Sequence, residues 1–197
     1  MAIVVEKYSP QALESVLTVL ASAFVTSPLL VAAFGPQQIE QNRTFFRIGL
    51  RHMFIGPAYV ASVDGDVCGY AHFNASPYCL PPPEELVNAL AHLLKPLGNA
   101  SPRVIQWFAR WCSLDPDEPH FHLGPIGVAP QMQGKGVGTA LMQRYIEHLD
   151  QDHAAGYLET DKPENVKFYE NFGFTVQHEE ELIGVPTWYM WRDRGAR

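Results

Sequence analysis

The fold of this chain is decided by residues 126–142, which read IGVAPQMQGKGVGTALM. An apolar strand is predicted to end at Pro130, and an amphipathic helix is predicted from about Gly136. The loop between them carries alternate glycines at Gly134, Gly136 and Gly138. Such a loop directs several backbone N–H groups at one point, and the helix N-terminus adds a partial charge of about +0.5. The stretch therefore predicts a binding site for phosphate or pyrophosphate.

The composition indicates one acidic folded domain over residues 1–197. Hydrophobic residues make up 47% of the chain and the formal net charge is −7, which is usual for a globular protein with its own core. No basic cluster stands out, so we expect no nucleic acid among the partners. No apolar stretch approaches the roughly 20 residues of a membrane span, so we expect no membrane partner. The acidic charge suits a cationic or amine-bearing partner.

The cysteines and the first residues predict a cytoplasmic location. Cys68, Cys79 and Cys112 form no Cys-x-x-Cys pair, and a scattered, odd set indicates free thiols in a reducing compartment. Residues 1–7 have no basic region followed by an apolar run, so they do not resemble a signal peptide.

Periodicity and turn residues predict alternating strands and helices. Asp64-Gly65 between two apolar runs is a strong hairpin signal, and the acidic run 179–181 is expected to be a solvated turn. We expect strands at 3–8, 58–63, 66–73, 120–128, 157–160, 174–178 and 188–191. We expect helices at 10–24, 38–54, 136–153 and 163–172.

Two nucleotide-binding motifs compete for the glycine loop, and its spacing disfavours both. A P-loop needs Gly, four residues, then Gly-Lys-Ser/Thr, but Gly134-Lys135 is followed by Gly136, and Ala129 stands at the first position. A Rossmann site is favoured by the strand–glycines–helix order and by Glu159 at about the distance of the ribose-binding acid. A Rossmann site needs the pattern Gly-x-Gly-x-x-Gly, whereas the glycines here follow Gly-x-Gly-x-Gly. It also needs the first glycine almost directly after the strand, whereas residues 129–133 separate the two here. A dinucleotide-binding module is therefore the less favoured alternative.

A third interpretation fits the loop and the chain after it. Residues 133–138, Gln-Gly-Lys-Gly-Val-Gly, resemble the Gln/Arg-x-x-Gly-x-Gly signature of the GCN5-related N-acetyltransferases (GNATs), whose loop holds the pyrophosphate of coenzyme A. The resemblance covers about residues 119–178. The finer pattern is similar to the puromycin N-acetyltransferase-like branch, in Gly-Lys-Gly at 134–136, Leu-Glu-Thr at 158–160, Asn-x-x-Phe-Tyr-Glu at 165–170, Gly-Phe-Thr-Val at 173–176 and Thr-Trp-x-Met at 187–190.

The resemblance implies a fold and a reaction. The fold is the α/β GNAT fold, a mixed, mostly antiparallel sheet of six or seven strands flanked by helices, with a helical insertion at about 74–118. The reaction is transfer of an acetyl group from acetyl-CoA, without a metal, to a primary amine of a small molecule that attacks the thioester directly. A non-catalytic acyl-CoA-binding sensor is the alternative, and monomer and homodimer are both left open.

The resemblance also implies roles for residues. Tyr169 is expected to protonate the departing thiolate, and Asn165, on the same helix face, to contact the cofactor. A phenol with a pKa near 10 can protonate a thiolate near 8.5 at a cost of roughly 2 kcal/mol. Tyr169 could instead be an aromatic residue of the core. Lys135 could add charge at the pyrophosphate or simply face solvent. The other expected cofactor-binding residues are Ile126, Gly127, Val128, Gln133, Gly134, Lys135, Gly136, Val137, Gly138 and Thr139.

Gly124-Pro125 interrupts the predicted strand 120–128. Because proline cannot donate to a sheet ladder, we expect the strand to be bulged or splayed from its neighbour. The cofactor could enter such a split. The alternative is that the pair simply ends a short strand early.

The base and the acceptor site are left open by the sequence. Glu159 could take the amine proton through water, orient a substrate ammonium, or hold a structural partner. His120 and His122 share one strand face, so they could act as the base or line the acceptor site. We expect no metal on this pair, because no third ligand has a suitable spacing.

The acceptor pocket could be aromatic. Trp188 is a candidate for it together with Trp107, Trp111, Tyr189 and Phe121, although such aromatics are more often core residues. The insertion at 74–118 is predicted to hold two helices, one from Pro81-Pro82-Pro83 through Leu94 and one over about 103–112. By analogy with other lids, we expect it to cover the acceptor.

Overall fold

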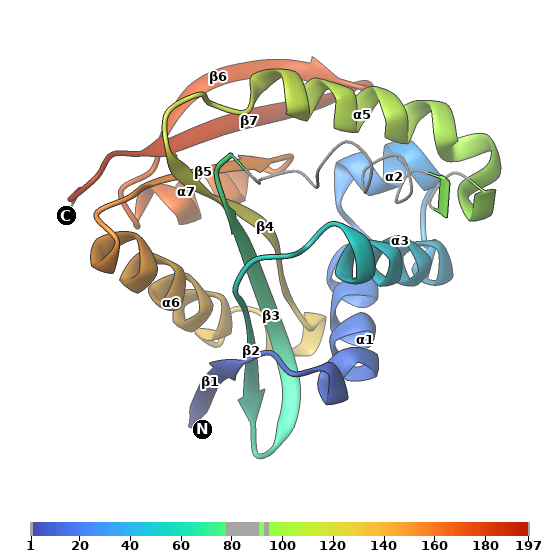
Figure 1. The fold of residues 1–197 in the computed structure, drawn as a ribbon. Coiled ribbons are helices and arrows are strands. Elements are labelled where there is room, and N and C mark those ends of the chain that lie inside the picture. Colours follow the sequence, from blue (N-terminus) through green and yellow to red (C-terminus); the bar gives the residue numbers. More distant parts are fainter. Residues whose placement is uncertain (1, 78–90, 93–94, 197) are drawn as a thin grey trace.

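The computed structural model describes residues 2–77, 91–92 and 95–196, which form a seven-stranded sheet between two layers of helices (Figure 1). The elements up to residue 77 are β1 (Ile3–Lys7), the 3-10 turn Pro10–Ala12, α1 (Leu13–Ala23), α2 (Pro28–Phe34), α3 (Ile39–His52), β2 (Ala58–Val63) and β3 (Asp66–Ala75). The elements from residue 95 on are the 3-10 turn Gly98–Ala100, α5 (Ser101–Leu114), β4 (His120–Val128), the 3-10 turn Pro130–Met132, α6 (Val137–Gln151), β5 (Ala155–Thr160), α7 (Pro163–Glu170), β6 (Thr175–Leu182) and β7 (Val185–Arg192).

The strand order is β1-β2-β3-β4-β5-β7-β6. All neighbouring strands are antiparallel except β4 and β5, which are parallel. The predicted mixed, mostly antiparallel sheet is confirmed, with seven strands.

Two hydrophobic clusters cover the two faces of the sheet. Helices α1, α2, α3 and α5 lie on one side and α6 and α7 on the other (Figure 1). Alternation along β3 serves both clusters: Tyr70 packs with Leu17 and Phe45 on the first side, whereas Phe73 packs with Leu141 on the second. The predicted helices on both faces are confirmed.

The hairpin between β2 and β3 turns at Asp64 and Gly65, as predicted. Their φ angles are 52° and 89°, as a two-residue turn with left-handed backbone at both positions requires. The strands pair at Val63 with Asp66 on either side of it.

Strand β4 is bulged against one neighbour and splayed from the other. Ala71 pairs with Ile126 and Phe73 with Leu123, so the two residues Gly124 and Pro125 lie opposite the single residue between them in β3. On the other side, β4 and β5 pair only from His120 to His122. The predicted split is confirmed, and the alternative of an early strand end is wrong because β4 continues to Val128.

Three expectations differ from the structure. The acidic run 179–181 is not a turn but part of β6, because its backbone pairs with β7 and Glu180 accepts from Tyr189 at 2.6 Å. The insertion begins after Ala75 rather than at 74, because Asn74 and Ala75 pair with β4. Helix α5 starts two residues before the predicted one and ends at Leu114. The helix predicted from Pro81-Pro82-Pro83 lies outside the described residues, as does Cys79.

Within the described ranges, no single helix has the length and apolar content to cross a membrane. The segments Pro10–Ala23 and Pro28–Phe34 have that length and apolar content only when the two are counted together. The two segments are bent by 92° relative to each other.

Candidate active site

The glycine loop presents a row of free amides. Gly134 and Gly136 have φ angles of 70° and 86°, a left-handed backbone that glycine adopts without strain. The N–H groups of 134–139 donate to no backbone carbonyl in the part of the chain that the structure describes. A Cβ built on Gly134 would meet no atom within 4 Å, so the loop faces open space at Gly134. Free amides at the start of α6 form a ready anion site.

Gln133 fixes this loop to the end of β4. Its Nε2 donates to the carbonyl oxygen of Val128 at 3.1 Å. Lys135 is exposed, so its side chain is free to reach either solvent or a bound anion. The loop therefore continues directly from the strand that borders the split.

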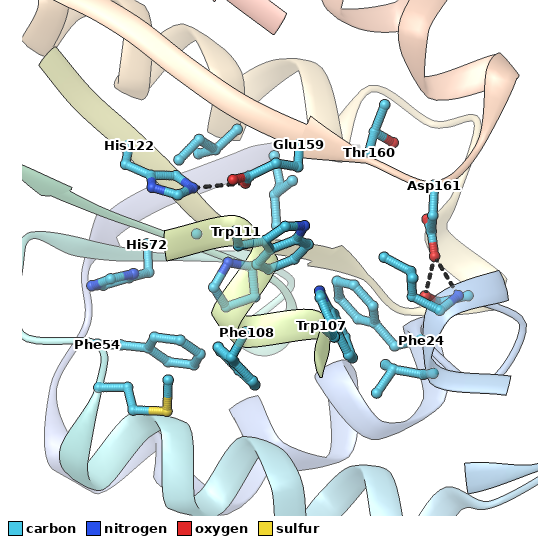
Figure 2. Close-up of a pocket in the computed structure, with 18 of the residues that line it drawn as sticks. Phe24, Phe54, His72, Trp107, Phe108, Trp111, His122, Glu159, Thr160 and Asp161 are labelled. Atoms are coloured by element: carbon cyan, nitrogen blue, oxygen red, sulfur yellow. Dashed lines mark hydrogen bonds and ion pairs between the residues drawn. The ribbon is translucent and has the colours of Figure 1, made fainter. Parts of the chain in front are cut away.

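A cavity of about 180 Å³ opens at the split between β4 and β5. Leu123 to Ile126 line it from β4. Glu159 and Thr160 line it from the end of β5, followed by Asp161 (Figure 2). Asn165 and Tyr169 border it from α7. The structure thus brings the predicted residues Ile126, Glu159, Asn165 and Tyr169 to one cavity.

Tyr169 presents a protonated phenol to this cavity. The residue is only 5% exposed. Burial raises the pKa of its hydroxyl, and the nearby Asp161 carboxylate raises it further. Asn165, one helical turn earlier, donates from Nδ2 to Thr160 Oγ1 at 3.1 Å. The phenol can therefore act as a proton donor at neutral pH.

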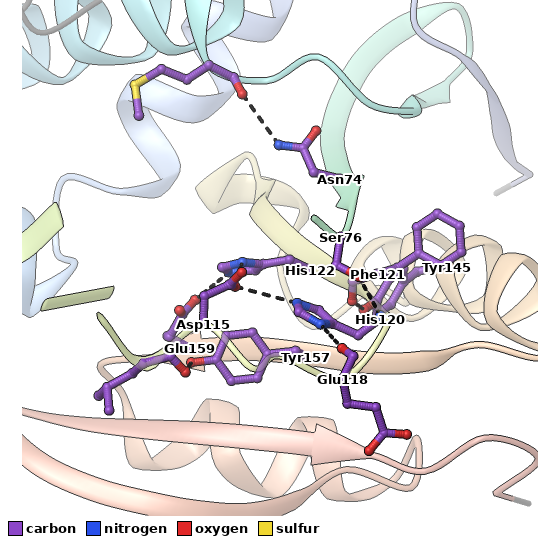
Figure 3. A network of polar contacts seen from close by, with 12 residues as sticks. Asn74, Ser76, Asp115, Glu118, His120, Phe121, His122, Tyr145, Tyr157 and Glu159 are labelled. Atoms are coloured by element: carbon purple, nitrogen blue, oxygen red, sulfur yellow. Dashed lines mark hydrogen bonds and ion pairs between the residues drawn. The ribbon is translucent and has the colours of Figure 1, made fainter. Parts of the chain in front are cut away.

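Glu159 and His122 form a hydrogen-bonded pair beside the split (Figure 3). The Nε2 of His122 lies 2.7 Å from Glu159 Oε2, and its Nδ1 lies 3.1 Å from Asp115 Oδ1. The Glu159 side chain is 2% exposed, and its Oε1 has no hydrogen-bond partner among the described residues. Because two carboxylates flank one imidazole, the imidazole holds both carboxylates in place, and Oε1 of Glu159 is left as an open proton acceptor.

Asp115 also lies near His120. Burial would raise the pKa of the Asp115 carboxyl, but hydrogen bonds from His120 and His122 outweigh it and hold the pKa well below its usual range. His120 is 3% exposed, and its Nδ1 donates to the carbonyl oxygen of Glu118 at 2.7 Å, since a carbonyl can only accept. The carboxylate of Asp115 therefore stays ionised at neutral pH.

The same three side chains have the spacing of a metal site. One ligand atom from each of Asp115, His120 and His122 lies within 4.8 Å of the others. The expectation that the histidine pair lacks a third ligand is wrong, because the chain after α5 returns Asp115 to β4. Two imidazoles and a carboxylate are ligands that suit zinc. These atoms also serve one another as hydrogen-bond and ion-pair partners, which supplies a role for them without an ion.

Comparison with known proteins decides the family. A sequence model of the Acetyltransferase (GNAT) family matches residues 29–174, most of the chain. The chain belongs to this family. It is therefore a GNAT-family acetyltransferase.

Solved structures share the fold of this acetyltransferase. One is histone acetyltransferase HPA2 and related acetyltransferase from Corynebacterium glutamicum, at 19% identity and a TM-score of 0.73, covering 100% of this chain and 99% of that one. Another, a GNAT family acetyltransferase from Brucella melitensis in complex with acetyl-CoA, is 16% identical with a TM-score of 0.55, covering 98% and 89%. A third, yncA from Salmonella typhimurium with its cofactor acetyl-CoA, is 13% identical with a TM-score of 0.60, covering 100% and 96%.

Some predicted residues of the acetyltransferase lie outside the cavity. Trp188 pairs with Thr160 across β5 and β7. Neither Trp188 nor His120 is among the residues that line the cavity. Gly127 is a glycine for packing reasons, since a Cβ there would come within 2.9 Å of Leu20 Cδ2. Its backbone remains available on β4.

Sequence reasoning missed several cavity residues of the acetyltransferase, among them Asp161 and His72. Asp161 accepts from Ser27 Oγ at 2.6 Å and from the Leu29 amide at 2.9 Å, and so anchors the start of α2 beside β5. His72 lies opposite the bulge, and burial lowers its pKa to about 3. Ser27-Pro28, a capping residue before a proline, was a usable signal for α2. No local pattern connects Asp161 or His72 to the site.

Proposed function

We propose that this acetyltransferase transfers an acetyl group from acetyl-CoA to the primary amine of a small molecule, by direct attack on the thioester and without a metal. The observation that carries the proposal is the split between β4 and β5, because one cavity there is lined by a buried phenol, Tyr169, and a buried carboxylate, Glu159. Acetyl-CoA is the donor we infer, since two of the similar structures hold it.

The residues of the loop and of β4 fit this donor. The free amides from Gly134 to Thr139 would bind its pyrophosphate, with Gln133 fixing the loop. The backbone of Ile126, Gly127 and Val128 would pair with the pantetheine arm, because the edge of β4 that faces β5 has no strand partner beyond His122 among the described residues. When bound, the donor supplies an activated acyl thioester.

The chain's own groups then handle two protons. The amine nitrogen bonds to the thioester carbon and the carbon–sulfur bond breaks. The amine proton goes to Oε1 of Glu159, directly or through one water, while His122 holds Oε2. The phenol of Tyr169 gives its proton to the departing thiolate, so the free thiol and the amide are the products.

We also propose that the chain falls in the puromycin N-acetyltransferase-like branch and works in the cytoplasm. The first inference rests on the five segments shared with that branch, from 134–136 to 187–190. The second rests on the free cysteines, Cys68 and Cys112, which suit a reducing compartment. Acetylation of puromycin in the assay below would support the branch.

Two measurements test the function. Isothermal calorimetry with acetyl-CoA and with NAD identifies the nucleotide ligand, and heat with NAD alone would overturn the proposal. A free-thiol assay with a panel of primary amines then tests transfer. Binding of acetyl-CoA with no thiol release above the hydrolysis rate on any amine would favour the acyl-CoA sensor instead. Repeating the assay after dialysis against a chelator is expected to leave the rate unchanged.

A further inference from the structure

We propose that Asp115, His120 and His122 form a zinc site that joins the end of α5 to β4 (Figure 3). The proposed reaction uses no metal, so the ion would stabilise the fold rather than supply chemistry. Zinc binding here is therefore independent of the proposed function, and its absence would leave that function untouched. The features that point to the site are three converging ligand atoms, the partners of the two outer ring nitrogens, and the local charge.

The three ligand atoms converge with nearly tetrahedral spacing. Oδ1 of Asp115 lies 3.1 Å from Nδ1 of His122 and 3.5 Å from Nε2 of His120. The usual zinc bond lengths at tetrahedral angles place neighbouring ligand atoms about 3.3–3.6 Å apart, so both distances agree with this spacing to within a few tenths of an ångström. The three atoms all lie within 4.8 Å of one another. One ion can therefore reach all of them after small side-chain movements.

The outer nitrogen of each imidazole has a partner of its own. Nδ1 of His120 donates to the carbonyl oxygen of Glu118 at 2.7 Å. Nε2 of His122 lies 2.7 Å from Oε2 of Glu159. A ligating histidine almost always donates its outer N–H to a carbonyl or a carboxylate, which leaves the lone pair of the other nitrogen for the metal. The surrounding chain therefore favours, in both rings, the tautomer that zinc needs.

Packing holds both imidazoles in place. The ring of Tyr157 meets the His120 ring edge-on at 5.5 Å between centroids, and the His122 ring at 4.9 Å. The backbone amide of His120 donates to Ser76 Oγ at 2.9 Å. Side chains that are already held in place lose little conformational entropy when they bind a ligand, so the site is organised before the ion arrives.

The local charge and the donor atoms favour zinc. Among the described residues, neither Asp115 nor Glu159 forms an ion pair with a lysine or an arginine, so a divalent cation would balance two carboxylates. Mg²⁺ and Ca²⁺ take oxygen ligands, whereas two ring nitrogens and one carboxylate suit zinc. The nearly tetrahedral spacing also favours zinc over Cu²⁺ and Ni²⁺, which prefer planar sites.

The site is open on one side. The side chains of Asp115 and His122 are 21% and 16% exposed, whereas that of His120 is fully buried. An ion can therefore enter from solvent, and water can take the fourth position. On binding, zinc replaces the proton that His122 Nδ1 shares with Asp115, and that proton passes to solvent. Without zinc the same atoms pair through the proton, so folding does not require the ion.

Zinc binding is measured on the full chain after dialysis against a chelator and then against metal-free buffer. We expect calorimetry with ZnCl₂ to show one strong site per chain. Co²⁺ should give the intense visible absorption of a tetrahedral complex, which added zinc then abolishes. Saturating zinc should raise the melting temperature by about 3 °C or more, because the ion binds the folded chain. No strong zinc site, or Co²⁺ with only the weak absorption of an octahedral complex, would overturn the proposal.

Two variants assign the binding to these ligands. Asp115→Asn and His120→Gln each remove one ligand, so both are expected to weaken zinc binding by at least about tenfold and to lose the rise in melting temperature. His178→Gln is the matched control, because His178 Nε2 also lies near a carboxylate, 3.8 Å from Glu180 Oε2, but belongs to no such cluster in the described part of the chain. Its zinc Kd should equal that of the wild type.

The decisive variant is Asp115→Asn, because its side chain is partly exposed and asparagine keeps its shape. Circular dichroism without zinc checks that this variant is folded. A wild-type zinc Kd in folded Asp115→Asn, or a Kd weakened only in His178→Gln, would place the ion elsewhere and overturn the assignment. If His120→Gln fails to fold, the comparison of Asp115→Asn with His178→Gln still decides between these outcomes.

Discussion

At the residue scale, Tyr169 carries the proton that the proposed reaction gives to the thiolate. Its burial keeps the phenol protonated until a strong base forms beside it. We predict that Tyr169→Phe lowers kcat by about 100-fold, within the usual range for a lost general acid. The Kd for acetyl-CoA in calorimetry should stay nearly the same, because the ring remains.

Tyr59→Phe is the control for this change. Tyr59 is also buried, and its hydroxyl lies 2.7 Å from His148 Nε2, outside the cavity lining. Its kcat should equal that of the wild type. A Tyr169→Phe enzyme with the wild-type rate would exclude the phenol from the mechanism.

Glu159 is the second residue whose removal separates chemistry from structure. Glu159→Gln keeps the shape and an oxygen for His122 but removes the charge that accepts the amine proton. We predict that kcat falls by about 100-fold. The melting temperature and the Kd for acetyl-CoA should change little. If the variant is much less stable but its folded fraction reacts at the normal rate, Glu159 has only a structural role, as the partner of His122.

At the element scale, the glycine loop should bind the donor through its backbone. Gly134 and Gly65 both have a left-handed φ, of 70° and 89°, and a Cβ on either would meet no atom within 4 Å. Alanine at either position should therefore cost about 1 kcal/mol of unfolding free energy, from backbone strain alone. We predict that only Gly134→Ala weakens acetyl-CoA binding, by about tenfold, as measured by calorimetry. Equal Kd values for the two variants would show that this loop does not bind the pyrophosphate.

The sequence predicts most of these elements because their signals are local. The strand 120–128 and the turn at Asp64-Gly65 follow from apolar runs and from glycine and proline positions, and the split follows from Gly124-Pro125. The run 179–181 misleads because its polar side chains suit a turn, whereas its backbone completes the edge of the sheet with β7. Pairing with a neighbouring strand outweighs local propensity there.

At the scale of the whole molecule, the cavity is assembled from distant parts of the chain. Phe24 and Phe45 come from the N-terminal helices, Trp107 from α5, and Glu159 and Tyr169 from the C-terminal half. Periodicity places each residue on an element but says nothing of which elements meet. Asp161 shows this best, since it joins β5 to α2 across 132 residues through the Leu29 amide. Sequence motifs therefore predict the glycine loop and the split proposed for the donor, and they predict single cavity residues such as Trp107 and Trp111. They do not predict how the distant segments meet.

The free energy of unfolding should depend on pH because His72 is buried in this cavity. Burial lowers its pKa from 6.5 to about 3. Between these values the unfolded chain binds a proton that the folded chain does not, so stability rises with pH and falls on acidification. From pH 7 to pH 5 the cost is about 2 kcal/mol, since each pH unit below 6.5 contributes about 1.4 kcal/mol.

We predict that His72→Gln removes this part of the pH dependence. Glutamine can still accept the hydrogen bond that the Gly56 amide donates to His72 Nε2 at 3.3 Å, but it does not titrate. Urea unfolding at pH 5 and pH 7 measures the difference, and the variant should lose about 2 kcal/mol less than the wild type between them. His153→Asn is the control, because His153 is exposed and asparagine tolerates its φ of 48°. A His72→Gln protein that loses as much stability as the control would show that His72 binds a proton equally well in the folded and the unfolded chain.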